Sequence, residues 1–299
     1  MTATTRRPAG TPDTPRATAP RADCTADSAG GLSFDIELPG AAERWDTALL
    51  LRLRASDPEE SVRLPLVPSS GGEVLRATLP STVPLAEGRW DAYLVFGEGE
   101  PQRLLPGCND LRSLVDRVPR TDRTWLGVRI PYTTKYGNLS VRAWLRWPHA
   151  EAGDVWPADG GVTVHGRLYG ARLTPTARLE ARPRHGAGGE DADAPVVTGS
   201  VTPADGPGFT ARLAYDGLAR EPGAGEEWEL WLRPGEDAEP VRIARILDDI
   251  ADKHKIMRYP AQPVADKGPD EEGALWARPY YTGANDLSVR LERSPSAAA

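Results

Sequence analysis

A twelve-residue segment of this chain occurs twice. Residues 131–142 read PYTTKYGNLSVR, and residues 279–290 read PYYTGANDLSVR. The two copies align without a gap at an offset of 148 residues, and seven of the twelve positions are identical. This offset is about the length of one domain and far longer than one unit of a solenoid. The sequence therefore predicts two copies of one fold, and such a duplication explains most of the chain without an active site.

Alternating apolar and polar residues predict that both copies are built from β-strands. The alternation covers residues 33–38, 90–96 and 139–147, and it returns in the second half over 228–232 and 287–291. A period of two places one set of side chains on a core and the other toward solvent, as in antiparallel sheets. Clusters rich in Gly and Pro separate the runs. About seven short strands in each half are typical of an immunoglobulin-like β-sandwich.

The predicted organisation is all-β, with two tandem duplicated sandwiches between two disordered ends. The boundaries are a disordered tail at 1–30, a first sandwich at 31–148, a second at 155–292 and a disordered end at 293–299. The tail has no apolar periodicity, so it cannot bury enough apolar surface to offset the entropy of ordering it. The polar stretch 148–154 is expected to join the sandwiches. Helical signals occur only at 109–118 and 245–257, where we expect a turn or two of helix.

Composition excludes several classes of function. The net charge of −7 and the pI near 5.3 argue against binding to nucleic acid or to an anionic membrane. No stretch approaches the ~18 consecutive apolar residues of a membrane span, and the N-terminus lacks the apolar core of a secretory signal. Cys24 lies in the predicted tail, so we expect no structural disulfide to Cys108. These features together predict a cytoplasmic protein.

Motifs for catalysis, metals and cofactors are not found in the sequence. It contains no Gly-x-Ser-x-Gly elbow and no Walker A loop. The scattered histidines have no second His or Cys at ligand spacing, so we predict no metal site and no cofactor; they are His149, His165, His185 and His254. Adjacent carboxylates such as Asp248 and Asp249 face opposite ways in a strand, and spacing alone does not make them an acid–base pair.

The repeated segment is the candidate binding surface. Tyrosine presents a flat apolar face with a polar tip, and arginine can hold an anionic group. The candidate residues are Tyr132, Tyr136, Asn138 and Arg142 in the first copy and Tyr280, Asn285 and Arg290 in the second. The outward-facing Tyr93, Trp144 and Trp231 would extend such a surface toward sugars or glycopolymers. A purely structural alternative is that Gly137-Asn138 and Asn285-Asp286 form tight turns with positive φ.

Two segments resemble a known class of proteins. Residues 132–141 (YTTKYGNLSV) and 90–94 (WDAYL) resemble β-rich regions appended to actinobacterial cell-wall glycopolymer transferases, of the glycosyltransferase and CDP-glycerol glycerophosphotransferase type. The resemblance covers the repeated β regions and no catalytic domain, because no alternating strand–helix pattern is present to carry one. It implies an accessory module whose partners are such a transferase and its polymer.

Three functional hypotheses remain open on the sequence. The first is a non-catalytic tandem β-sandwich module of cell-surface glycopolymer synthesis, acting as a scaffold or binding glycan or polyol-phosphate chains. The second is a transferase with a site on loops between the sandwiches, which needs Asp248, Asp249, His254 or Arg142 to converge in a cleft. The third is a purely structural module for protein interaction. An aromatic groove at the repeated turn would favour the first hypothesis. A deep polar cleft between the halves would favour the second, and flat charged faces on both sandwiches would favour the third.

Overall fold

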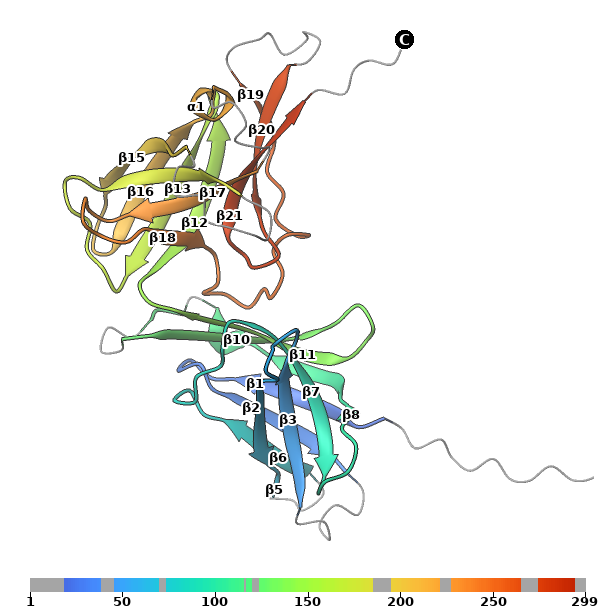
Figure 1. Cartoon of the computed structure of the whole chain (residues 1–299). Helices are drawn as coiled ribbons and strands as arrows, with labels where there is room; N and C mark the ends of the chain where they lie inside the picture. The colour runs from blue at the N-terminus through green and yellow to red at the C-terminus, as the bar shows by residue number, and fades with distance from the viewer. Residues whose placement is uncertain are drawn as a thin grey trace, which may run out of the picture.

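The structure is a computed structural model that describes residues 19–38, 46–69, 74–115, 117–119, 124–184, 195–220, 227–264 and 274–293. Over these residues the regular structure is almost entirely β, which confirms the predicted all-β class. Two short helices accompany the strands, η2 (Arg112–Leu114) and α1 (Asp216–Ala219). Figure 1 shows two β-rich halves stacked on each other. The predicted disordered ends fall largely outside the described residues.

The first half consists of two sheets that face each other across one core. One sheet has the order β5 (Val67–Pro68), β6 (Val74–Leu79), β2 (Leu32–Glu37), β1 (Arg21–Ala26), β9 (Leu105–Asp110). The other has the order β10 (Leu126–Thr133), β11 (Leu139–Arg146), β7 (Gly88–Phe96), β3 (Thr47–Leu53), β4 (Ser61–Pro65), with β8 (Gln102–Arg103) paired to β7. Phe34 from one sheet and Leu49 and Trp90 from the other belong to the same buried cluster. The half is therefore a β-sandwich.

The second half forms one ten-stranded sheet. Its strands are β12 (His149–Ala158), β13 (Gly161–Tyr169), β14 (Arg178–Pro183), β15 (Val197–Pro203), β16 (Gly208–Ala214), β17 (Glu227–Arg233), β18 (Val241–Ala244), β19 (Gln262–Pro263), β20 (Leu275–Tyr281) and β21 (Leu287–Arg293). The path β14-β15-β16-β13-β12-β18-β17 returns to its start, because β14 also pairs with β17. This ring encloses Phe209, Tyr215 and Trp228 and leaves none of its strands with a free edge.

The strand pairings of the first half recur in the second. In each half the first strand pairs in parallel with a strand that follows the tryptophan-bearing strand, β1 with β9 and β12 with β18. The tryptophan strand also pairs with the last strand, so that Trp90 lies opposite Val141 and Trp228 opposite Val289. The repeated segment forms the equivalent hairpins β10–β11 and β20–β21. The division into domains at 148 and 155 stays a prediction.

Two local predictions need correction. The predicted tail is too long, because residues 21–26 form β1 with Ala22, Cys24 and Ala26 buried; alternation of such small residues gives little hydrophobic signal. Residues 245–257 form no helix; they contain one hydrogen-bonded turn, in which the N–H groups of Ile256 and Met257 donate to the Lys253 carbonyl. The expected join at 148–154 overlaps the step from β11, which ends at Arg146, to β12, which begins at His149.

The two free cysteines should differ sharply in reactivity. Burial, reinforced by the charges of Asp23 and Asp35, raises the pKa of the Cys24 thiol to about 12, whereas Cys108 is exposed. Because the thiolate is the reactive form, we expect one thiol per native chain to react with Ellman's reagent at pH 8 and both to react in guanidinium chloride. Two thiols that react equally fast in the native protein would contradict the placement of Cys24 in the core.

Candidate functional site

The two copies of the repeated segment form turns with the same backbone hydrogen bonds. The N–H of Gly137 donates to the Thr134 carbonyl, and the N–H of Asn285 donates to the Thr282 carbonyl. Gly137 (φ 78°) and Asn285 (φ 62°) occupy the same turn position and both lie in the left-handed region. The predicted tight turns with positive φ are thus present, and the two turns can be compared position by position.

The surroundings of the two turns are different. In the first turn Tyr136 is 77% exposed, and only the Lys135 ammonium lies over its ring, 4.8 Å from the centroid. The second turn is seated on the first half. Trp144 Nε1 donates to the Ala284 carbonyl at 2.9 Å, and Arg146 pairs with Asp286 at 2.8 Å. The first turn is therefore an open surface, while the second joins the two halves.

Asn285 serves the fold through its side chain. It is fully buried, and its Oδ1 accepts a hydrogen bond from the Lys253 N–H at 3.0 Å. Its Nδ2 donates to the carbonyls of Ile250 and Ala251. These bonds match the structural alternative for this position and not the ligand contact that we predicted.

The other predicted binding residues are spread over two faces. Arg290 pairs with Glu227 at 2.6 Å and lies over the Tyr280 ring, 4.7 Å from its centroid. Tyr132 pairs across β10–β11 with Ser140, and Asn138 closes the first turn. The charge of Arg290 is thus matched within the second half. The structure does not bring the seven predicted residues together at one place.

The outward aromatic rings are covered by arginines. Tyr93 has the guanidinium groups of Arg52 and Arg103 at 5.3 and 4.8 Å from its ring centroid. Trp231 has those of Arg182 and Arg242 at 5.3 and 5.0 Å. Such cation–π contacts occupy the rings, so neither is open for stacking on a sugar. An Arg-x-Arg pattern at 52–54 and 182–184 is the sequence signal that accompanies this arrangement in both halves.

Arg142 is the predicted residue with the most unusual surroundings. It is 8% exposed, lies directly opposite Arg89 on β7 and stacks on Trp144 at 5.0 Å. Within the described part of the chain it makes no hydrogen bond or ion pair, and its Nε is buried. Burial and the charge of Arg89 lower the pKa of Arg142. Like charges placed opposite each other across two strands are destabilising.

Among the residues that the structure describes, no carboxylate forms an ion pair with Arg142 or Arg89. The charge of Glu87 acts on Arg142, but Glu87 and Asp286 both form their ion pairs with Arg146, at 2.6 and 2.8 Å. Arg89 donates only to a carbonyl, that of Gly283 at 3.3 Å. The junction of the two halves thus holds two guanidinium groups without an acidic partner, which is the arrangement of an anion site.

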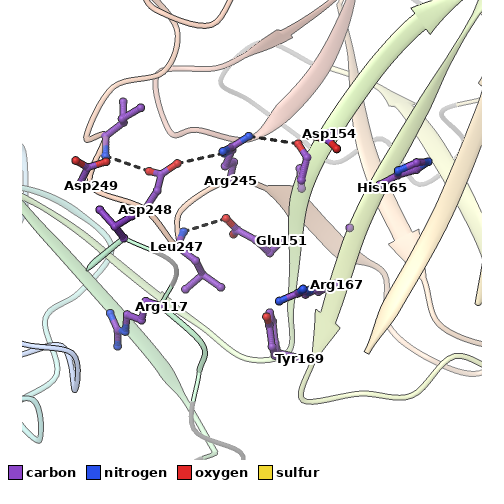
Figure 2. Close-up of a pocket in the computed structure, with 15 residues that line it drawn as sticks. Arg117, Glu151, Asp154, His165, Arg167, Tyr169, Arg245, Leu247, Asp248 and Asp249 are labelled. Carbon is purple, nitrogen blue, oxygen red and sulfur yellow. Dashed lines mark hydrogen bonds and ion pairs between the residues drawn. The ribbon is translucent and has the colours of Figure 1, made fainter. Parts of the chain in front are cut away.

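A polar cleft of about 680 Å³ opens elsewhere between the halves (Figure 2). Its lining includes Glu151, Asp248 and Asp249, but neither Arg142 nor His254. Asp248 is held in ion pairs by Arg245 at 3.1 Å and Lys253 at 2.6 Å, and the His254 Nδ1 faces the Tyr281 carbonyl. The four residues that the transferase hypothesis needs therefore do not converge. No cluster of three metal-ligating side chains occurs among the described residues.

Comparison with known proteins gives no family. No family model and no curated protein matches the chain. Among solved structures, TarS of S. aureus matches at 12% identity over 70% of this chain and 38% of that one, with a TM-score of 0.28. The 217–571 fragment of TarS matches at 13% identity over 65% of this chain and 55% of the fragment, also with a TM-score of 0.28. A marsupial T cell receptor matches at 7% identity over 93% of this chain and 92% of that one, with a TM-score of 0.24. The chain spans less than two fifths of TarS, and at these TM-scores we argue function from the site alone.

The two turns provide a matched test of burial. Asn285→Ala removes three side-chain hydrogen bonds. Alanine also tolerates positive φ less well than asparagine, so we expect the free energy of unfolding to fall by about 3 kcal/mol. Gly137→Ala meets open space and should cost only about 1 kcal/mol of backbone strain. Urea unfolding of both variants measures the difference, and equal losses would show that the second turn is not seated as described.

Glu180 is a buried carboxylate that lies opposite Trp231 on the neighbouring strand. Its surroundings predict that the stability of the fold depends on pH in the acidic range. It is 2% exposed and accepts hydrogen bonds from Arg233, Arg182 (2.8 Å) and Arg178 (3.0 Å). Burial by itself raises the pKa of Glu180, but the hydrogen bonds from Arg233 and Arg182 lower it overall. Because the pKa is lower in the folded chain, this stabilisation is present at neutral pH and is lost as pH falls below about 4.5.

Glu180→Gln should therefore unfold more easily than the wild type at pH 7, by about 2 kcal/mol, since the three arginines lose their shared partner. The gap should narrow as pH falls below about 4.5, because the wild-type chain then loses the stabilisation that the ionised carboxylate provides. Thermal unfolding at a series of pH values measures the gap. A difference that stays constant between pH 7 and 3 would mean that the ion pairs do not carry it.

Proposed function

We propose that this chain is a non-catalytic module that binds an anionic, polyol-phosphate type of cell-surface glycopolymer, and that Arg142 and Arg89 hold one of its phosphate groups. The observation that carries the proposal is the buried Arg142 guanidinium, which faces Arg89 and has no acidic partner. A phosphate diester would supply the missing negative charge. Guanidinium groups suit this role because their planar donors match phosphate oxygens in pairs.

An anionic polymer fits the surface better than a neutral glycan. The outward rings of Tyr93 and Trp231 already carry arginines on their faces, so these two rings are not open for stacking on a sugar. The chain as a whole carries a net charge of −7, and a pair of unmatched arginines is therefore a local feature and not a general excess of positive charge. The resemblance of residues 132–141 to β-rich regions of glycopolymer transferases agrees with this class of ligand.

The second turn would form the rim of this site. The carbonyl of Gly283 accepts a hydrogen bond from Arg89, and Gly283 itself is exposed. A Cβ at this position would lie 3.6 Å from an Arg89 Nη atom, so a side chain added here would stand directly beside the Arg89 guanidinium. We propose that the polymer reaches the arginines past this glycine. In the cytoplasm the module would then hold the growing chain for a glycosyltransferase or glycerophosphotransferase.

The test is a calorimetric titration of the wild type with glycerol phosphate oligomers and with a neutral maltooligosaccharide of similar length. We expect binding of the phosphate oligomers only, and a loss of about tenfold or more in affinity, at least ~1.4 kcal/mol, in Arg142→Gln. Arg212→Gln, which replaces an exposed arginine on β16, is the matched control and should bind like the wild type. Equal binding of the neutral oligosaccharide, or unchanged affinity in Arg142→Gln, would refute the proposal.

Stability separates this role from a structural one. Arg142→Gln removes one of two facing like charges and breaks no hydrogen bond, so its unfolding free energy should stay within about 0.5 kcal/mol of the wild type. Gly283→Trp offers a second variant that leaves both arginines in place and obstructs the proposed entry. A Gly283→Trp variant that folds and still binds with full affinity would place the polymer elsewhere.

A further inference from the structure

The cleft between the halves contains charged side chains that the fold does not use. Asp154, His165, Arg167 and Asp249 line it, are exposed and make no hydrogen bond or ion pair with any residue that the structure describes. Two are acids and two can carry positive charge. The polar groups available to a ligand in this cleft are thus of both signs.

A fixed frame lies behind these side chains. The Glu151 carboxylate accepts the N–H groups of Ile246 at 2.9 Å and Leu247 at 3.0 Å. Arg245 is held between the Gly153 carbonyl and Asp248, as Figure 2 shows for the Asp248 contact. Because the frame residues are satisfied within the chain, they hold the shape of the cleft before any ligand arrives, which lowers the ordering cost of binding.

A β-bulge directs Asp154 into the cleft. The register of β12 against β13 shifts between Ala152 and Val155, so Gly153 and Asp154 form the irregular step. A Cβ at Gly153 would lie 3.1 Å from the His165 carbonyl, a tight contact that favours glycine at this step of the bulge. Bulges of this kind re-aim side chains and are common beside functional sites. The position of Asp154 is therefore built into the strand.

The charges are separated along the cleft. Figure 2 shows Arg117, Arg167 and Tyr169 on one side of Glu151, and Asp154, Asp248 and Asp249 on the other, together with Arg245, whose charge is paired with Asp248. The strand register agrees, because Arg167 pairs with Glu151 while Asp154 lies farther along β12. A simple anion bound at Arg167 would leave Asp154 and Asp249 without a counter-charge, and a simple cation bound at these two carboxylates would leave Arg167 without one.

We propose that this cleft binds a zwitterionic polyhydroxyl compound of the amino-sugar phosphate class. Its phosphate would lie at Arg167 and its ammonium group at Asp154 and Asp249, with the hydroxyl groups toward His165 and Tyr169. A volume of about 680 Å³ accommodates a monosaccharide phosphate. This site is separate from the Arg142–Arg89 pair, neither of which lines the cleft, and the inference does not depend on the function proposed above.

Three related compounds test the charge requirement. Glucosamine 6-phosphate carries both charges, glucose 6-phosphate only the phosphate, and glucosamine only the ammonium group. We expect calorimetry on the full chain to show glucosamine 6-phosphate binding about tenfold or more tightly than either of the others. Equal affinities for the three compounds, or no binding of glucosamine 6-phosphate at millimolar concentration, would overturn the proposal.

Single variants then assign the two ends of the ligand. Arg167→Gln should lower the affinity for glucosamine 6-phosphate to that for glucosamine, and Asp154→Asn should lower it to that for glucose 6-phosphate. Both variants should keep the wild-type melting temperature, because neither side chain makes an internal bond that the structure describes. Arg212→Gln, which replaces an exposed arginine on β16, is the control and should bind like the wild type. Unchanged affinity in both cleft variants would refute the assignment.

Discussion

The seating of the second repeated turn on the first half is the contact on which the rest of the structure depends. The carbonyl of Ala284 receives the Trp144 indole N–H, Asp286 pairs with Arg146, and Asn285 is bonded to residues 250–253. These contacts cover Trp144 and hold the segment after β18 against the core of the first half, where Ile246 and Leu247 are buried. The same contacts leave Arg142 at the edge of the junction, where partial exclusion of water strengthens the pull of its charge on an anion.

The turn of the repeated segment thus has a different role in each copy. The positions of Gly283 and Ala284 correspond to Lys135 and Tyr136 in the first turn, and only the smaller pair permits the close approach to β11. Asn285 replaces Gly137 and adds a side chain that bonds the neighbouring loop while tolerating positive φ. The backbone of the turn is common to both copies, and the side chains decide whether it remains open or becomes an interface.

Much of the fold follows from local pattern, whereas the sites depend on long-range pairing. The alternation around Trp90 and Trp228 and the turn residues Gly137 and Asn285 predict strands and tight turns correctly, because both signals act within a few residues. Strand β1 was not predicted, because its buried residues Ala22 and Cys24 are small and give little hydrophobic signal. The isolation of Arg142 could not be predicted, since it depends on Arg146 taking both Glu87 and Asp286, which come from distant parts of the chain. Likewise, the shape of the cleft depends on the hydrogen bonds that the N–H groups of residues 246 and 247 donate to the Glu151 carboxylate, about 95 residues away in the sequence.

Nuclear magnetic resonance of the arginine side chains tests the central claim most directly. A titration of ¹⁵N-labelled protein with glycerol phosphate oligomers should shift the Nε–Hε signals of Arg142 and Arg89 and the backbone amide of Gly283. The signals of the exposed Arg212 on β16 and of Tyr136 in the open turn should not move. Shifts confined to the Tyr136 turn, or saturable binding without any change at Arg142, would contradict an anion site at the junction of the two halves.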